Sequence, residues 1–452
     1  LDRRGQPRGH NRKRTRCKRH GVTNFARMSA LARNLLSANA SVDGDGRLRI
    51  AGLDALDLAA EFGTPLFVYD EDDLRARARE AVAAFGDGVA FASKAFLCKA
   101  IAQLVHEEGM CIDVSTAGEM HVALAAGVPA ERLVLHGNNK SEAELARALD
   151  VGLGRIIIDS NDEIDRLERL LADRPGVRPN VLIRVTPGVE AHTHEYVMTG
   201  QEDSKFGFSF VSGAAAEAVA RLMNAPVNLV GIHAHIGSQI FRTDGFEQEV
   251  AVLAEFVKES GVEEFCVGGG LGVAYVEREE GPSITQWGNT VKAAAARAGI
   301  PADVKITAEP GRTIVAPTAL TLYTVGTIKH LPGIRTYVAV DGGMSDNPRP
   351  VLYGSGYETF LPRCVDAERD FDITLVGKHC ESGDVIVRDG RVPADTAVGD
   401  ILATPVTGAY GYSMASNYNK VPRPAVVFVR DGNARLVLRR ETLDDLLALD
   451  VD

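Results

Sequence analysis

Short apolar runs recur eight times between residues 89 and 312, and most are followed by a polar or glycine-containing segment and then by a helical stretch. β-Rich runs that alternate with helices predict a (β/α)8 barrel, in which the reactive groups lie at the carboxyl ends of the strands. The runs are residues 89–92, 111–114, 133–136, 155–158, 181–184, 229–233, 265–267 and 305–308.

The ends of the predicted strands carry most of the candidate chemistry. They include one lysine, several histidines, a run of three glycines and a carboxylate, which would all face one mouth of the barrel. These positions are Lys94, 113–115, 136–138, Asp159, Arg184, 233–239, 268–272 and 309–312.

A second, β-rich domain is expected, because 452 residues exceed the roughly 250 that such a barrel needs. After Arg312 the helical pattern fades, and Asp-Gly pairs predict hairpin turns within 385–392 and 426–438. The run 65–69 has strand character and precedes a helix predicted over 71–85. The expected division is a tail at 1–27, a barrel at 70–316, and a discontinuous β-sandwich or β-barrel domain formed by 28–69 and 317–452.

The first 27 residues differ in charge from the rest of the chain. They contain ten lysines and arginines and one aspartate, whereas the whole chain has a net charge of −11. A basic arm could touch nucleic acid, but it has no interleaved aromatic residues, and the acidic body argues against nucleic acid as the main partner. We expect residues 1–27 to be a disordered tail or a mis-assigned start before Met28.

Composition also limits location and metal chemistry. No apolar run approaches the roughly 18 residues of a membrane span, so a cytoplasmic protein with no membrane partner is expected. The six cysteines show no Cys-x-x-Cys spacing, which argues against a zinc site and a disulfide framework. Reduced thiols, mostly buried, and no bound metal are therefore predicted.

Lys94 follows the first predicted strand, in the segment Phe91-Ala-Ser-Lys94-Ala95. Apolar surroundings at the barrel mouth would favour the neutral amine, a nucleophile that can form a Schiff base. The alternative is a lysine in a solvated ion pair.

The run from His233 to Gln239 offers two readings. His233 and His235 would share one face of strand six, either as a metal-binding pair or with His235 as a flat surface for a planar cofactor and Ser238 as a hydroxyl for its phosphate. A metal site needs further ligands that the neighbouring strand ends lack, and His192 and His194 fall in a loop, so the cofactor reading is favoured.

Phosphate sites in such barrels commonly form from the loops after strands seven and eight. The turn at 268–272 follows strand seven, and backbone N–H groups around Gly269 and Gly270 can approach oxyanions there. The segment Glu309-Pro-Gly311-Arg312 follows strand eight. A carboxylate such as Glu309 beside a pyridine nitrogen keeps it protonated, which makes the ring an electron sink.

Together these motifs resemble the fold type III pyridoxal-phosphate decarboxylases, most closely their diaminopimelate-specific branch. The similarity runs from about residue 45 to 450 and rests on many segments in the same order. They include Ala92-Ser-Lys-Ala95, His136-Gly-Asn-Asn-Lys140, Ser204-Lys-Phe-Gly207, His235-Ile-Gly-Ser-Gln239, Glu309-Pro-Gly-Arg312, Asp341-Gly-Gly-Met344, Arg349-Pro-Val-Leu-Tyr353, Cys380-Glu-Ser-Gly-Asp384 and Gly408-Ala-Tyr410.

The resemblance implies a role for each matching residue. Lys94 would hold pyridoxal 5'-phosphate as a Schiff base, and Cys380 would protonate the carbanion once carbon dioxide has left. The implied cofactor contacts are His235, Ser238, Gly269, Gly270, Glu309, Gly311, Arg312 and Tyr410, and the implied substrate contacts are Arg312, Arg349, Tyr353, Glu381 and Tyr410. The resemblance also implies a homodimer with shared active sites, in which Cys380 and Glu381 come from the partner subunit.

The implied reaction is decarboxylation of meso-diaminopimelate to L-lysine, the last step of bacterial lysine biosynthesis. The distal carboxylate of this substrate needs a fixed cation, which Arg312 and Arg349 can supply through bidentate contacts. Relatives of the ornithine type, which typically have Cys-Asp in place of Cys380-Glu381, are the main alternative. A cofactor carrier without turnover and a metal hydrolase are less favoured, because carriers lack a β-domain and the metal ligands are too few.

Overall fold

The computed structural model describes residues 30–188 and 203–451. The expectations for residues 1–27, and those for His192 and His194, concern positions outside these ranges.

Eight parallel strands form the barrel, in the order β13-β12-β11-β9-β8-β7-β6-β5. Two backbone hydrogen bonds bring the edge strands together, from Ala90 to the carbonyl of Ala308 at 3.0 Å and from Ala92 to that of Pro310 at 3.2 Å. All eight predicted runs are confirmed as strands: β5 (Ala90–Ala92), β6 (Cys111–Val114), β7 (Leu133–Leu135), β8 (Arg155–Ile158), β9 (Asn180–Thr186), β11 (Asn228–Ala234), β12 (Glu264–Cys266) and β13 (Lys305–Thr307).

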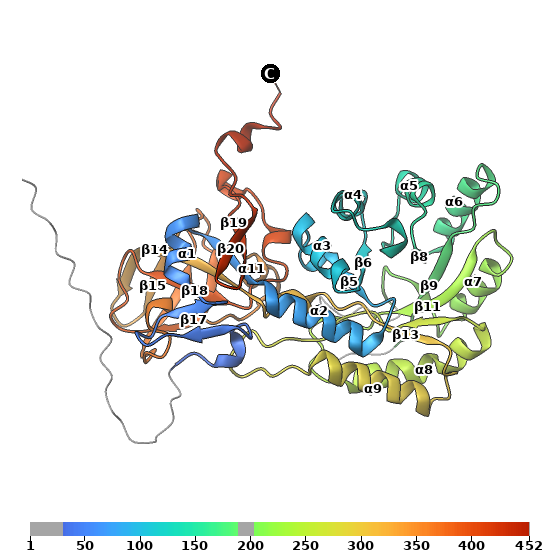
Figure 1. Ribbon diagram of the computed structural model, residues 1–452, viewed down its shortest axis with the longest axis horizontal. Coiled ribbons are helices and arrows are strands. Elements are labelled where there is room, and N and C mark those ends of the chain that lie inside the picture. The colour runs from blue at the N-terminus through green and yellow to red at the C-terminus, as the bar shows by residue number, and fades with distance from the viewer. Residues whose placement is uncertain (1–29, 189–202, 452) are drawn as a thin grey trace, which may run out of the picture.

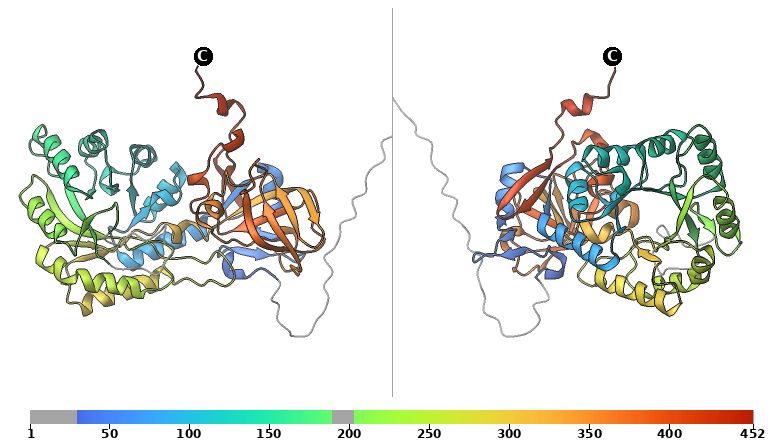
Figure 2. Two further views of the ribbon diagram at one scale, coloured as in Figure 1. Left: turned by 180° about the vertical axis from the view of Figure 1, so that it is seen from behind. Right: turned by 45° about the vertical axis from the view of Figure 1, so that its right-hand side comes forward.

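Helices surround the barrel as an outer ring (Figures 1 and 2). The predicted helix over 71–85 is confirmed as α2 (Glu71–Phe85), and Ser141 opens α5 with a capping box that satisfies its first backbone N–H groups. The other helices of the ring are α3 (Lys99–Glu107), α4 (Ala117–Ala125), α5 (Glu142–Val151), α6 (Asn161–Ala172), α7 (Ala214–Leu222), α8 (Asp244–Ser260) and α9 (Ile284–Arg297).

The second region is built mainly of β-strands, and a strand from before the barrel lies in the middle of its sheet. This strand, β4 (Leu66–Asp70), pairs antiparallel with β14 (Ala319–Leu331) and parallel with β19 (Ala425–Arg430). The order is β17-β16-β15-β14-β4-β19-β20, and β18 also pairs with β14. The remaining elements are β15 (Arg335–Val340), β16 (Phe371–Val376), β17 (Val385–Val392), β18 (Ile401–Pro405), β20 (Asn433–Leu438), α11 (Arg349–Tyr353), α1 (Ala55–Phe62), and a small sheet of β1 (Ala40–Val42), β2 (Leu48–Ile50) and β3 (Leu53–Asp54).

One of the two predicted hairpins is confirmed. Strands β19 and β20 are joined by Asp431 and Gly432, whose φ angles of 49° and 72° are the positive values that a tight hairpin turn requires. The prediction of a hairpin within 385–392 was wrong, because these residues form the single strand β17. Gly390 lies opposite Ile373 beside an irregularity in the β16–β17 register, so the Asp389-Gly390 pair marks a bulge rather than a turn.

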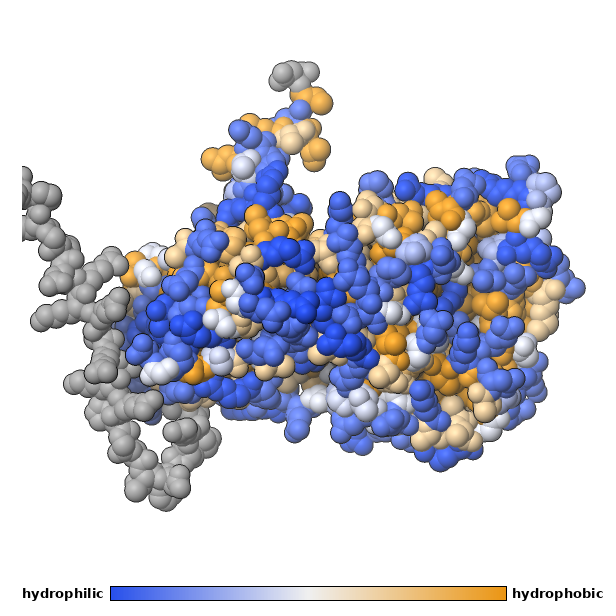
Figure 3. Space-filling model, viewed as in Figure 1, coloured by the Kyte–Doolittle hydropathy of each residue, from blue (hydrophilic) through white to orange (hydrophobic). Residues whose placement is uncertain are grey.

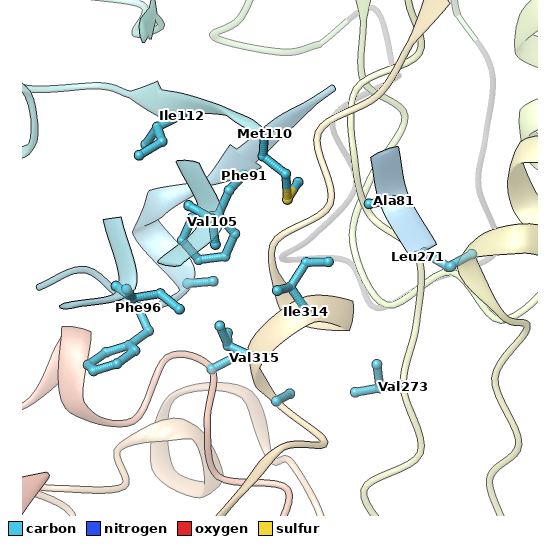
Figure 4. Close-up of a cluster of buried hydrophobic side chains, with 14 of the residues drawn as sticks. Ala81, Phe91, Phe96, Val105, Met110, Ile112, Leu271, Val273, Ile314 and Val315 are labelled. Atoms are coloured by element: carbon cyan, nitrogen blue, oxygen red, sulfur yellow. The ribbon is translucent and has the colours of Figure 1, made fainter. Parts of the chain in front are cut away.

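Buried aromatic residues join the barrel to the β region. The ring of Tyr69 on β4 stacks on Phe96, which follows β5, with 4.8 Å between centroids, and the Tyr69 hydroxyl donates to the carbonyl of Gly408 at 2.7 Å. Figure 4 shows Phe91 and Phe96 in this core beside Ile314 of α10 (Arg312–Val315). The core thus holds the segment before Tyr410 against the barrel mouth.

The described surface is mostly polar over the barrel helices (Figure 3). Apolar side chains gather on the projecting C-terminal segment, where Leu443, Leu447, Leu449 and Val451 are exposed. None of the helices within 30–188 and 203–451 has the length and apolar character needed to cross a membrane.

Candidate active site

A cavity of about 420 Å³ lies at the carboxyl ends of the barrel strands, a size typical of small-molecule sites. Tyr410 from the β region closes one side, and its backbone N–H donates to the carbonyl of Ala95 at 2.8 Å. All nine residues expected to contact a cofactor line it: Lys94, His235, Ser238, Gly269, Gly270, Glu309, Gly311, Arg312 and Tyr410.

Lys94 lies on a short turn directly after β5 and reaches the cavity. The expected apolar surroundings do not bury Lys94, because it is exposed in a cavity that Asp113 and Glu309 also line. Among the described residues no carboxylate forms an ion pair with Lys94, which also argues against the solvated ion pair considered from sequence. The amine is therefore accessible to a carbonyl compound.

Glu309 lies between two histidines, one after β7 and one near the end of β11. Its Oε2 is hydrogen-bonded to His233 Nε2 at 3.0 Å, and its Oε1 lies 3.0 Å from His136 Nε2. His136 Nε2 is also 3.5 Å from a carboxylate oxygen of Asp113. The strand-end positions of these residues were expected, but the contacts of His136 and His233 with Glu309 were not.

The contacts within this cluster set the charge of each group. Burial disfavours a charged His136, but Glu309 and Asp113 outweigh burial and raise its pKa to about 9. Burial also opposes ionisation of Glu309, yet His136 and His233 hold the pKa of that carboxyl well below its usual range. Burial lowers the pKa of His233. At neutral pH Glu309 is therefore an anion beside a protonated His136 and a neutral His233.

This cluster predicts a pH dependence of stability in the cofactor-free protein. The pKa of His136 rises from 6.5 to about 9 on folding, so its stabilising effect is complete below pH 6.5 and is lost as the pH rises through 9. Melting temperatures of wild type should therefore fall across this window more steeply than those of His136→Gln. His121→Gln, at an exposed position, serves as the control, and parallel curves for wild type and His136→Gln would contradict the assignment.

Glycines allow the loops around the cavity to pack directly on one another. A Cβ atom on Gly269 would lie 2.3 Å from the carbonyl oxygen of Glu309, and one on Gly270 would lie 2.1 Å from that of Gly237. No larger residue fits either place. Beside this turn Arg312 donates to Ser238 Oγ at 2.9 Å, so a cation, a hydroxyl and the backbone of the glycine turn all line the cavity. These are groups that bind a phosphate.

His235 gives the cavity a flat wall. Its Nδ1 accepts a hydrogen bond from the backbone N–H of Gly269 at 3.2 Å, which fixes the ring relative to the glycine turn. Burial lowers the pKa of His235 well below 6.5, and the cations Lys94 and Arg184 lower it further. The ring is therefore neutral and suited to stacking on a planar group.

Four of the expected residues do not line the cavity. Cys380 and Glu381 are exposed in the β region, where the Cys380 N–H donates to Asn419 Oδ1 at 2.9 Å. Tyr353 is half-buried at the end of α11. Arg349 is buried at the start of α11 and is linked to the cavity residue Arg312 through Tyr275. The single chain thus brings together the expected cofactor contacts but only part of the expected substrate contacts.

The contacts of Tyr275 and Tyr357 with these arginines were missed from sequence. Tyr275 lies in an irregular segment between β12 and α9, where no periodicity marks a residue as buried. The one sequence signal for a role of Tyr275 near the cavity was its position seven residues after Gly268, the first residue of the glycine turn.

A pyridoxal-type cofactor fits the residues present better than a metal does. His136, His233 and Glu309 could offer three ligand atoms within 4.8 Å of one another. However, Glu309 contacts both histidines directly. A metal site would also not account for the accessible amine of Lys94, the flat ring of His235 or the groups around Arg312 that can bind a phosphate. An amine, a carboxylate, a stacking ring and an oxyanion site in one cavity match an aldehyde-bearing pyridine phosphate.

Known proteins are similar along nearly the whole chain. The family described as pyridoxal-dependent decarboxylase, pyridoxal binding domain, matches residues 71–316. Diaminopimelate decarboxylase of Mycobacterium tuberculosis is 50% identical over 442 residues, covering 93% of this chain and 98% of that protein. The enzyme of that name from Bacillus subtilis is 46% identical over 423 residues, covering 90% and 95%.

A solved structure supports the same relationship. Diaminopimelate decarboxylase from M. jannaschii in complex with L-lysine has a TM-score of 0.84 and 31% identity, covering 92% of this chain and 98% of that one. The chain therefore belongs to the diaminopimelate decarboxylase family of pyridoxal-dependent decarboxylases.

Proposed function

We propose that this chain decarboxylates meso-diaminopimelate to L-lysine and carbon dioxide with pyridoxal 5'-phosphate, as the last step of lysine biosynthesis. The observation that carries the proposal is the single cavity in which Lys94, His235, Glu309 and Arg312 meet. When bound, the cofactor supplies the electron sink for the bond that breaks.

Each cavity residue has a proposed task. Lys94 would hold the cofactor covalently, His235 would stack on its ring, and Glu309 would pair with its ring nitrogen as an anion. Ser238, Arg312 and the backbone of the loops after β12 and β13, including Gly269, Gly270 and Gly311, hold the phosphate end. Tyr410 closes the site from the β region.

The substrate is proposed to place its distal carboxylate near Arg312 and Arg349, with Tyr353, Glu381 and Tyr410 as further contacts. Cys380 would return the proton to the carbon from which carbon dioxide has left. Cys380 and Glu381 are exposed, so we propose a homodimer in which they complete the cavity of the partner subunit. The proposed location of this dimer is the cytoplasm. The two parts of the β region, 28–69 and 317–452, would act as one domain beside the barrel at 70–316.

The shared site can be tested by mixing two inactive variants. Lys94→Ala carries an intact Cys380, and Cys380→Ala carries an intact Lys94. After subunit exchange, about one quarter of all sites would combine the two intact residues if the dimer is random and isologous. Recovery of activity to about that level supports the proposal, and no recovery despite exchange shown by mass spectrometry would count against it.

Arg349→Ala is expected to raise KM for meso-diaminopimelate by roughly 100-fold, because a charge-assisted contact to the distal carboxylate is lost. kcat should change much less, since Arg349 does not line the cavity at Lys94. Steady-state kinetics measures both constants. The control is Arg335→Ala, which removes an exposed arginine stacked on Tyr337 in the same β region. An unchanged KM would show that the carboxylate is held elsewhere.

A decarboxylase for ornithine, lysine or arginine remains the second candidate. Such a substrate has no distal carboxylate, and two buried arginines would face it unpaired, which is costly. The deciding experiment is incubation of the holoenzyme with each amino acid while carbon dioxide and the amine product are quantified together. Equal amounts of carbon dioxide and L-lysine from meso-diaminopimelate alone support the proposal, and turnover of ornithine instead would replace it.

A further inference from the structure

Four arginines among the described residues are buried, and they fall into two kinds. Arg184 lies 3.9 Å from a carboxylate oxygen of Asp159, and Arg369 is paired with Glu277 and Glu358. Arg312 and Arg349, in contrast, form no ion pair with any carboxylate of the described ranges. A buried guanidinium without an anion is costly, so this pair calls for an anionic ligand.

One aromatic residue links the two unpaired cations. Arg312 Nη1 donates to the Tyr275 hydroxyl at 2.7 Å, and the Arg349 guanidinium carbon lies 4.1 Å from the centroid of the Tyr275 ring. Tyr275 itself is only 3% exposed. Tyr275 therefore contacts Arg312 mainly through its hydroxyl and Arg349 through its ring, with the Arg312 guanidinium carbon farther from the ring centroid, at 5.8 Å.

A second tyrosine completes the arrangement from the β region. Arg349 Nη1 donates to the Tyr357 hydroxyl at 2.7 Å, and the Tyr357 ring meets the Tyr275 ring edge-on at 5.2 Å. Burial raises the pKa of Tyr357 to about 12, so this phenol is neutral at physiological pH. The tyrosines thus orient both guanidinium groups without neutralising them.

We propose that Tyr275 is a positioning residue that aligns Arg312 and Arg349 for the distal carboxylate of the substrate. This inference rests on the proposed function for the identity of that anion. Stacking fixes the plane of the Arg349 guanidinium, and the hydroxyl fixes one arm of Arg312, so the remaining N–H groups are oriented before the carboxylate arrives.

Binding of two product-like ligands to the holoenzyme tests this role without relying on turnover. L-Lysine retains the distal carboxylate, whereas cadaverine is the same diamine without it. Tyr275→Leu removes both the ring and the hydroxyl and is expected to raise the Kd of L-lysine by roughly tenfold or more, while the Kd of cadaverine stays unchanged. Tyr275→Phe keeps the stacking and should raise the Kd of L-lysine by only a few-fold.

Tyr337→Leu is the matched control, because Tyr337 also lies beneath an arginine but away from the cavity. It should leave both affinities at wild-type values. Calorimetry that finds equal weakening of L-lysine and cadaverine in Tyr275→Leu, or no weakening of either, would overturn the inference. If Tyr275→Leu does not fold, the same comparison of the two ligands in Tyr275→Phe decides, with unchanged L-lysine affinity as the contrary result.

The outcome is separate from that of the proposed function. Wild type that binds L-lysine more tightly than cadaverine and loses this preference in Tyr275→Leu would support the positioning role even if meso-diaminopimelate were not decarboxylated. Wild type that binds both ligands equally would contradict a carboxylate pocket at these arginines, whatever its turnover.

Discussion

Lys94→Ala is expected to lower kcat for meso-diaminopimelate by at least about 10⁴-fold, because the residue proposed to bind the cofactor covalently is lost. The visible absorbance of the bound cofactor should disappear with the activity. Stopped assays for L-lysine and an absorption spectrum after gel filtration measure the two effects on the same sample.

Lys99→Ala is the matched control for this experiment. Lys99 is an exposed lysine at the start of α3, close to Lys94 in sequence but outside the cavity. It should retain both the colour and the activity of wild type. A coloured, fully active Lys94→Ala protein would refute the role of Lys94.

Glu309→Gln is expected to lower kcat by roughly 10²- to 10³-fold, the effect of losing one well-placed charge that stabilises the transition state. The amide keeps the shape of Glu309 but cannot balance a protonated ring nitrogen. It also removes the anion that helps to raise the pKa of His136 to about 9, so the histidine should lose its proton at lower pH. Kinetics and the ¹⁵N NMR titration of His136 report the two effects independently.

Glu249→Gln provides a buried control on α8. Burial raises the pKa of Glu249 well above its usual range, and Glu309 raises it further, so this carboxyl is already neutral and the amide removes no charge. It should leave kcat within a few-fold of wild type. An equal loss of kcat in both variants would mean that Glu309 acts through packing rather than charge.

The barrel could be predicted from sequence because each strand is an apolar run with a polar residue or a glycine at its end. That pattern places Lys94, His235 and Glu309 at one mouth through topology alone. Local turn chemistry was less reliable. Asp431-Gly432 and Asp389-Gly390 have the same sequence, but only the first pair lies between two strands, whereas the second is held in a bulge by its neighbour β16.

The features that sequence could not provide depend on contacts between distant segments. Lys94 is exposed in a cavity built by several strand ends, which no pattern around residue 94 indicates. Tyr275 joins Arg312 and Arg349 across two regions of the fold. Cys380 is exposed in the β region of the single chain, and its place in the cavity of a partner subunit is part of the proposal.

Borohydride reduction of the holoenzyme, followed by peptide mapping, tests the covalent role of Lys94 most directly. Reduction turns a Schiff base into a stable amine and so marks the lysine that held the cofactor. One modified peptide is expected, with the pyridoxyl group on Lys94. A modified protein in which Lys94 is untouched and another lysine carries the group would contradict it.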